Sequence, residues 1–107
     1  MHRVPLKGLS LNMAYRGRRF TTPALKQFQK DMARLLPRIV VPEGKLAAHF
    51  RFGVSSKNAD VDNLCKTALD SLAEKYQFND KRVSEIHLWK EDVARGKEFI
   101  EFMIFPA

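Results

Sequence analysis

The feature of the sequence that most constrains the fold is an apolar stripe in the second half of the chain. Its members recur at spacings of three and four residues: Val61, Leu64, Cys65, Ala68, Leu69 and Leu72. This spacing places apolar side chains on one face of a helix, and that face must be buried against another element. The stripe therefore predicts an amphipathic helix that continues to about Lys75, with Cys65 as a small buried hydrophobe rather than a nucleophile.

A second helix is predicted nearer the N-terminus. Thr22 can cap the free amides of a first helical turn, and Pro23 suits the first helical position. Pro37 ends the pattern. The preceding residues 10–19 are polar and carry three arginines around a glycine. They predict an irregular basic loop that either contacts phosphate or forms a solvated surface turn.

Four stretches predict strands, because their apolar residues alternate or cluster in short runs. They cover residues 3–9, 45–54, 83–90 and 99–105. We expect the last two to form a hairpin, and the last strand, apolar on both faces, to be either a central strand or a subunit contact. The order β-α-β-α-β-β predicts an α+β fold, with two helices on one face of a small mixed or antiparallel sheet. A length of 107 residues suits a single domain over residues 1–107.

The charge of the chain restricts its partners. Nineteen Lys and Arg residues against twelve Asp and Glu residues give a formal net charge of +7. Such a balance suits a polyanion such as DNA, although a basic chain can also use its charge only to stay soluble. The single cysteine forms no internal disulfide, and the apolar runs are too short to span a bilayer. We therefore expect a cytoplasmic, DNA-associated protein.

Chemistry-bearing residues concentrate at the start of the helix that the stripe predicts. Asp60 and Asp62 stand two residues apart and are followed by Asn63, Lys66 and Asp70. Helix capping and an ion pair between Asp62 and Lys66 would explain part of this pattern. However, at 100° per residue Asp62, Lys66 and Asp70 share one strip of the helix. Carboxylates gathered in this way are suitable ligands for Mg²⁺, and a lysine beside them can stabilise charge on a phosphate.

These residues resemble the signature of the RusA family of Holliday junction resolvases. The helix carries Asp60-x-Asp62-Asn63-x-x-Lys66, followed by Asp70-Ser71-Leu72. The later turn Asn79-Asp80-Lys81-Arg82-Val83 is similar to an acidic turn of the family, and Ser10-x-Asn12-x-x-Tyr15 is similar to a polar motif near its start. In arrangement the similarity covers nearly the whole chain, and the helix motif is its most specific part.

The resemblance implies a homodimeric, Mg²⁺-dependent endonuclease that makes paired, symmetric cuts across a four-way DNA junction, with Mn²⁺ as a possible substitute metal. It implies Asp60, Asp62 and Asp80 as metal ligands and Lys66 as the catalytic lysine, with Asp70 and Asn63 in support. The chain departs from the family at Ala59, where a basic residue is common, and at Asn79, where an acid is common. If Asp80 is not the third ligand, Glu85 or Asp70 must supply it.

Six basic residues are candidates for phosphate contacts: Arg16, Arg18, Arg19, Lys57, Lys81 and Arg82. They would position DNA without reading its sequence. Two other functions stay open at this point. One is a non-catalytic DNA-binding module of the same fold, and the other is a Mg²⁺-dependent nuclease that acts on other branched DNA.

Overall fold

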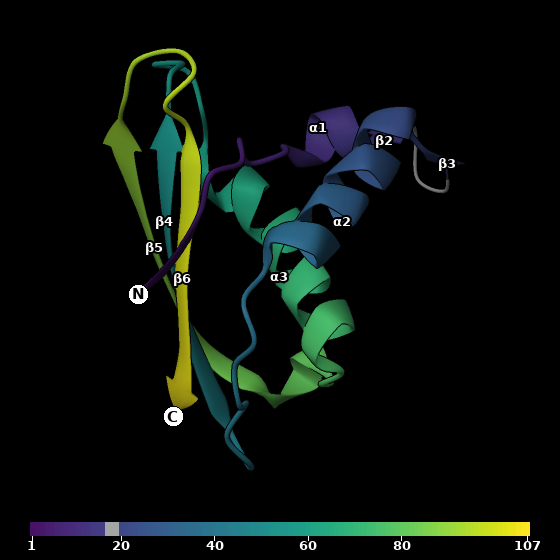
Figure 1. Cartoon of the computed structure of the whole chain (residues 1–107), viewed down its shortest axis with the longest axis vertical. Coiled ribbons are helices and arrows are strands. Elements are labelled where there is room, and N and C mark those ends of the chain that lie inside the picture. The colour runs from purple at the N-terminus through teal and green to yellow at the C-terminus, as the bar shows by residue number, and fades with distance from the viewer. Residues whose placement is uncertain (17–19) are drawn as a thin grey trace.

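The computed structural model describes residues 1–16 and 20–107 and gathers the helices on one face of a sheet (Figure 1). The sheet contains β1 (His2–Val4), β4 (Leu46–Val54), β5 (Val83–Asp92) and β6 (Phe99–Pro106). The helices are α1 (Leu11–Ala14), α2 (Pro23–Leu35) and α3 (Val61–Tyr76), with a short 3-10 helix η1 (Asp80–Arg82). A separate ribbon pairs β2 (Tyr15–Arg16) with β3 (Phe20–Thr21). The predicted α+β class is confirmed, and of the two kinds of sheet expected, mixed or antiparallel, the structure has the mixed one.

The strands of the main sheet follow the order β1-β6-β4-β5. β4 pairs in parallel with β5 and in antiparallel with β6, and β6 pairs in antiparallel with β1. Of the two alternatives for the last strand, a central strand or a subunit contact, the structure shows a central position. The predicted hairpin is wrong, because β4 lies between β5 and β6, and the connecting loop passes over the end of β4 (Figure 1). Alternation showed which face of a strand is apolar, but it carries no information about the strand's partner.

The core lies between the sheet and the two long helices. Phe50 and Phe52 of β4 have no exposed surface, and their rings stack with centroids 5.7 Å apart. The predicted stripe of α3 meets them, since Leu64, Ala68 and Leu72 all belong to the same buried cluster. Each such leucine or phenylalanine contributes about 1.5–3 kcal/mol when it leaves water. This packing fixes the position of α3 and therefore of the acidic residues at its start.

Cys65 is buried within the same cluster, as predicted. Its burial raises the pKa of the thiol, which opposes any role as a nucleophile.

The segment before α2 is more regular than predicted. In place of an irregular loop, the chain forms α1 and β2, and Ser10 caps α1 by accepting a hydrogen bond from the amide of Met13. Thr22 caps α2 as expected, and its Oγ1 also donates to the carbonyl of Met13 at 2.6 Å. A bond between two segments cannot be read from local composition, which explains the error. Residues 17–19, the rest of the predicted loop, lie outside the described residues.

Helix α2 begins at Pro23, and α3 ends at Tyr76, followed by the C-cap Gln77, whose φ of 54° is left-handed. The first strand is shorter than predicted, because only residues 2–4 pair with β6. Within the described residues, no helix has both the length and the apolar character needed to cross a membrane.

Candidate metal and DNA site

Asp60 and Asp62 lie at the exposed start of α3. Asp60 occupies the cap position with φ −92° and ψ 118°, yet its side chain makes no capping hydrogen bond. Asp62 lies in the first turn and is also exposed. No ion pair within the described residues includes Asp62, so the predicted pairing with Lys66 is not formed. Neither helix capping nor ion pairing therefore engages the carboxylates of Asp60 and Asp62 within the described residues.

Lys66 is held by two other carboxylates. Its Nζ lies 2.8 Å from Oδ1 of Asp70, one turn further along α3, and 3.7 Å from Oδ2 of Asp80. The hydrogen bond to Asp70 raises the pKa of Lys66, and the nearby Asp70, Asp80 and Tyr15 add to this against a smaller cost of desolvation. The ammonium therefore stays protonated at neutral pH and can act as a cation, but not as a general base.

Asp80 reaches Lys66 because the chain reverses sharply after α3. Gln77 ends the helix in a left-handed conformation, and the amide of Phe78 donates to the carbonyl of Ala73. Phe78 is buried in the core, which anchors the turn. Asn79 then caps η1 by accepting a hydrogen bond from the amide of Lys81 at 2.9 Å. Asn79 has a structural task here, and Asp80 is the acid that this turn brings to α3.

The three predicted metal ligands are only partly brought together. Lys66 contacts Asp80, and Asp62 precedes Lys66 by one helical turn, an axial rise of about 6 Å. Across the part of the chain that the structure describes, no group of three Asp, Glu, His or Cys residues is close enough to hold a metal ion. Thus Asp60, Asp62 and Asp80 do not form a ready-made three-carboxylate cluster within one chain.

Of the two alternative ligands, Asp70 is bonded to Lys66, as described above. Glu85 pairs in register with Ala47 on the sheet and lies near enough to His49 to influence its pKa. His49 alternates along β4 with the core residue Phe50, so His49 and Glu85 lie on the sheet face opposite the helices. Glu85 is therefore remote from the start of α3.

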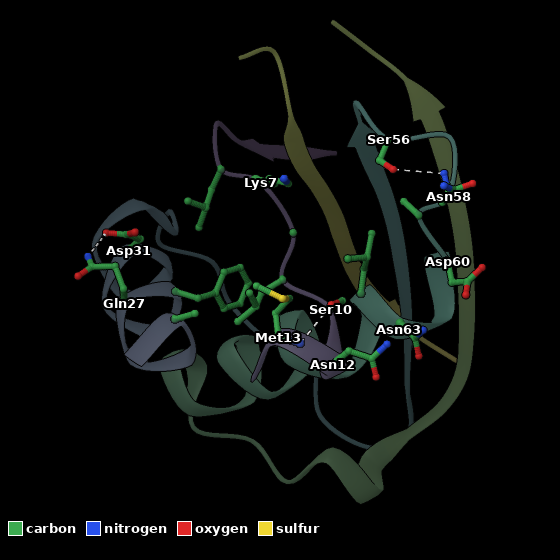
Figure 2. Close-up of a pocket in the computed structure, with 17 residues that line it drawn as sticks. Lys7, Ser10, Asn12, Met13, Gln27, Asp31, Ser56, Asn58, Asp60 and Asn63 are labelled. Atoms are coloured by element: carbon green, nitrogen blue, oxygen red, sulfur yellow. Dashed lines mark hydrogen bonds between the residues drawn. The ribbon is translucent and has the colours of Figure 1, made fainter. Parts of the chain in front are cut away.

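A cavity of about 580 Å³ opens beside Asp60 (Figure 2). Its polar lining includes Asn12, Asn58 and Asn63, and its apolar lining comes from the N-terminal segment, α2 and α3. Neither Asp62 nor Lys66 lines it, so the cavity adjoins the acidic residues from one side.

The predicted phosphate-binding residues differ in their surroundings. Lys57 and Lys81 are exposed. Arg82 is half-buried, and its guanidinium donates to the carbonyls of Pro42 and Gly44, so it braces that loop. The structure describes the backbone of Arg16 in β2 and not its side chain. Arg18 and Arg19 lie outside the described residues.

Two further residues near the site received no role from sequence reasoning. Lys90 Nζ donates to the carbonyl of Ala59 at 3.1 Å, which adds a cation beside Asp60. Tyr15 is close enough to Lys66 to influence its pKa. Lys90 lies opposite Phe52 because β5 pairs in parallel with β4. The predicted hairpin paired the last two strands with each other and so did not place Lys90 beside β4. Tyr15 belongs to the N-terminal motif, and a hydrogen bond of 2.6 Å from Thr67 Oγ1 to the carbonyl of Leu9 joins the segment before Tyr15 to α3.

Neither the protein-family models nor the curated proteins add a relative to the fold and geometry described above. No protein-family model matches the chain, and no curated protein matches it either.

Proposed function

We propose that this protein is a Mg²⁺-dependent, structure-selective endodeoxyribonuclease of the RusA type that resolves four-way DNA junctions by paired nicks. The observation that carries the proposal is the 3.7 Å approach of Asp80 to Lys66. Lys66 belongs to the helix motif on α3, and Asp80 belongs to the later acidic turn, which forms η1. Their meeting supports a shared site for an anionic substrate.

In this proposal Asp60 and Asp62 offer the first ligands for the metal, and Asp80, which lies against Lys66, would complete the site by approaching them when the metal binds. Mg²⁺ favours oxygen ligands and usually keeps several waters while it bridges to substrate phosphate, so one or two carboxylates can begin its binding. Once bound, it supplies a Lewis acid and a more acidic water. The lack of described partners on Asp60 and Asp62 supports their assignment, because both carboxylates are free to bind.

Lys66 stabilises negative charge on the phosphate, and Asp70 is a positioning residue. A cation directed at the position where charge develops lowers the barrier to hydrolysis. Asp70 holds Nζ by a 2.8 Å hydrogen bond and keeps the ammonium charged. Asp80 would then contact both the lysine and the metal. This arrangement gives the two acids on either side of Lys66 different tasks.

The DNA backbone would lie across the exposed lysines around the site. Lys57 precedes α3, Lys81 follows Asp80, and Lys90 contacts the carbonyl of Ala59. These lysines would offset the repulsion between carboxylates and phosphate. Arg82 is occupied by the loop that contains Gly44, and we leave it out of the proposed DNA contacts.

Paired nicks need two copies of the site, and the face of the sheet without helices is our candidate for the subunit contact. This aromatic face centres on His49, whose ring lies 4.4 Å from those of His87 and Phe105 and 5.3 Å from that of Trp89. Desolvation and His87 lower the pKa of His49, so its ring is neutral at pH 7. Met103 is partly exposed on the same face.

Charge distinguishes the aromatic face from the rest of the molecule. Arg3 and Arg51 lie there with Glu85, Glu91 and Glu101, so acidic residues slightly outnumber basic ones on this face, whereas the whole chain carries +7. An aromatic face without excess positive charge suits a second copy of the chain better than it suits DNA.

The dimer is tested by the molar mass of Trp89→Glu in solution, measured by light scattering. Its matched control is Ile86→Glu, because Ile86 is 45% and Trp89 is 44% exposed on the same strand, with side chains on opposite faces. We expect the first substitution to yield monomer and the second to leave the dimer intact. If both variants keep the mass of the parent, the subunit contact lies elsewhere.

The nuclease is tested by incubating the protein with labelled four-way junction and with linear duplex, with and without Mg²⁺. We expect cleavage of the junction only with Mg²⁺, and a loss of about 10²-fold or more in Asp62→Asn and Lys66→Ala. Binding to the junction without any cleavage would instead support a non-catalytic module of this fold. Equal cleavage of both DNAs would leave a nuclease but remove the junction preference, and cleavage of forks or flaps would point to other branched DNA.

A further inference from the structure

We propose that the cavity beside Asp60 receives one unstacked base of the bound DNA. This inference rests on the proposed function, which it deepens by giving the enzyme a contact that reads sequence next to the cut. The cavity, about 580 Å³ in volume, lies within the usual size range of ligand sites. Its walls come from the N-terminal segment, the start of α2 and the loop that leads into α3.

The cavity is lined by both apolar and polar side chains. Leu6, Leu9 and Phe28 contribute apolar walls, and Met13, which also lines the cavity, is 61% exposed. Figure 2 shows the labelled polar side chains on two sides of this apolar centre. An aromatic base gains stabilisation from such walls through stacking and desolvation.

The polar groups on the side nearer Asp60 suit the edge of a base. Asn12, Asn58 and Asn63 each carry an amide that donates and accepts hydrogen bonds, and all three line the cavity (Figure 2). On the opposite side Gln27 Nε2 donates to Asp31 Oδ1 at 3.0 Å, which leaves the other amide and carboxylate atoms for a ligand. Side-chain amides are the groups that pair with base edges in DNA recognition.

Charge favours a base over a phosphate in this cavity. Two carboxylates, Asp31 and Asp60, line it with one ammonium, Lys7. Arg34, 3.7 Å from Asp31, and Lys90, which donates to the carbonyl of Ala59, offset these carboxylates, so the cavity has little net charge within a chain of net charge +7. Such a cavity offers a phosphate little attraction, whereas a neutral base needs none. The backbone phosphates can remain outside with the exposed lysines while a base turns inward.

The position of the cavity explains why a branched substrate would be preferred. Unstacking a base costs a few kcal/mol in duplex DNA, and the cost is smallest where pairing is already disturbed. The crossover of a junction is such a place. A base taken up beside Asp60 would hold the neighbouring phosphate near the proposed metal ligands.

The experiment uses four-way junctions with 2-aminopurine, whose fluorescence rises when it unstacks, at each position that flanks the crossover in turn. The parent protein is added in EDTA, so that no cleavage occurs, and a mobility-shift assay measures binding. We expect fluorescence to rise at one position when the parent protein binds. The rise should be lost in Ala24→Trp, which fills the cavity from its exposed edge. It should remain in Ala33→Trp, an exposed alanine of the same helix outside this cavity.

Asn12→Asp provides a second variant that leaves the cavity open. It replaces an exposed amide with a carboxylate, which can only accept hydrogen bonds when ionised. We expect the preference for one base at the responsive position to change by about tenfold, the discrimination that one good base contact provides.

The outcomes separate this inference from the proposed function. Saturated binding without a fluorescence rise at any position overturns the base cavity, and so does an equal rise in the parent protein and Ala24→Trp. Either result leaves the nuclease proposal standing if Mg²⁺ then restores cleavage by the parent protein. A rise that Ala24→Trp abolishes, in a protein that never cleaves, supports the cavity and overturns the nuclease. Failure to bind any junction overturns both.

Discussion

Replacing Gly53 with alanine tests how closely the two central strands approach. A Cβ atom added to Gly53 would lie 2.3 Å from Cδ2 and Cε2 of Phe99, which is its partner in register on β6. Phe99 is only 4% exposed, and the Arg3 guanidinium lies 4.0 Å from its ring centroid. The ring is therefore packed against neighbours and cannot move aside freely.

The expected effect is the difference between two opposing terms. Overpacking of this kind costs about 1–3 kcal/mol. Against it, alanine restricts the unfolded chain more than glycine does, which contributes about 0.4–1 kcal/mol where the backbone conformation is compatible. Gly53 has no positive φ, so its backbone accepts alanine. We expect Gly53→Ala to lower the free energy of unfolding by about 1–2 kcal/mol, because the steric term exceeds the entropic term.

Urea unfolding of the single and double variants measures this effect. In Phe99→Leu the ring is absent, so adding Gly53→Ala should cost much less there, and the double-mutant cycle should give a clear coupling energy. Gly96→Ala is the control, since Gly96 has a φ of +90° and no atom within 4 Å of an added Cβ. Its cost comes from backbone strain and should not depend on residue 99. A Gly53→Ala variant as stable as the parent, or an unchanged cost in Phe99→Leu, would refute the reasoning.

Two further predictions concern the site. Because the folded-state pKa of Lys66 is raised above 10.5, its stabilising contribution is complete at lower pH and is lost only as the pH rises through the folded value. Stability from Lys66 should thus be constant between pH 7 and 9, and Asp70→Asn should lower the Nζ pKa in an NMR titration; an unchanged pKa would remove Asp70 as the positioning residue. Thr67→Val should cost about 1–3 kcal/mol in urea unfolding, because it leaves the carbonyl of Leu9 without its hydrogen bond. Ser71→Ala should not loosen the N-terminal segment, because the hydrogen bond that the Ser71 hydroxyl donates goes to Thr67 of the same helix; hydrogen exchange of residues 9–15 distinguishes the two variants.

Local patterns predicted the long elements well. The stripe from Val61 to Leu72 and the Thr22-Pro23 cap predicted α3 and α2, since spacing and capping depend on neighbouring residues alone. The alternation in residues 45–54 likewise predicted β4, which spans Leu46–Val54. Strand partners could not be predicted in this way. The direction of β5 relative to β4 depends on the crossover through α3, and the same alternating residues fit either direction.

The candidate site likewise combines features that local sequence predicts with features that depend on tertiary contacts. Asp60, Asp62 and Lys66 fall within one short helical motif, so the sequence predicted that they lie on or beside the same helix. The approach of Asp80 to Lys66 was implied by resemblance alone, because it depends on the reversal at Gln77. The contact of Lys90 with the turn before α3 depends on the parallel register. The cavity depends on three segments meeting, and no single stretch of sequence contains that information.

The central place of β6 has a consequence for the order in which the chain can fold during synthesis. β4 obtains its antiparallel partner only when residues 99–106 have left the ribosome, and within the described residues β1 obtains its strand partner at the same moment. Until then, the backbone of β4 has an unpaired edge that can associate with other chains. The turn that carries Asp80 is synthesised earlier, yet the sheet beside it is still incomplete. A nascent chain of this protein should therefore need protection from aggregation until β6 has been synthesised.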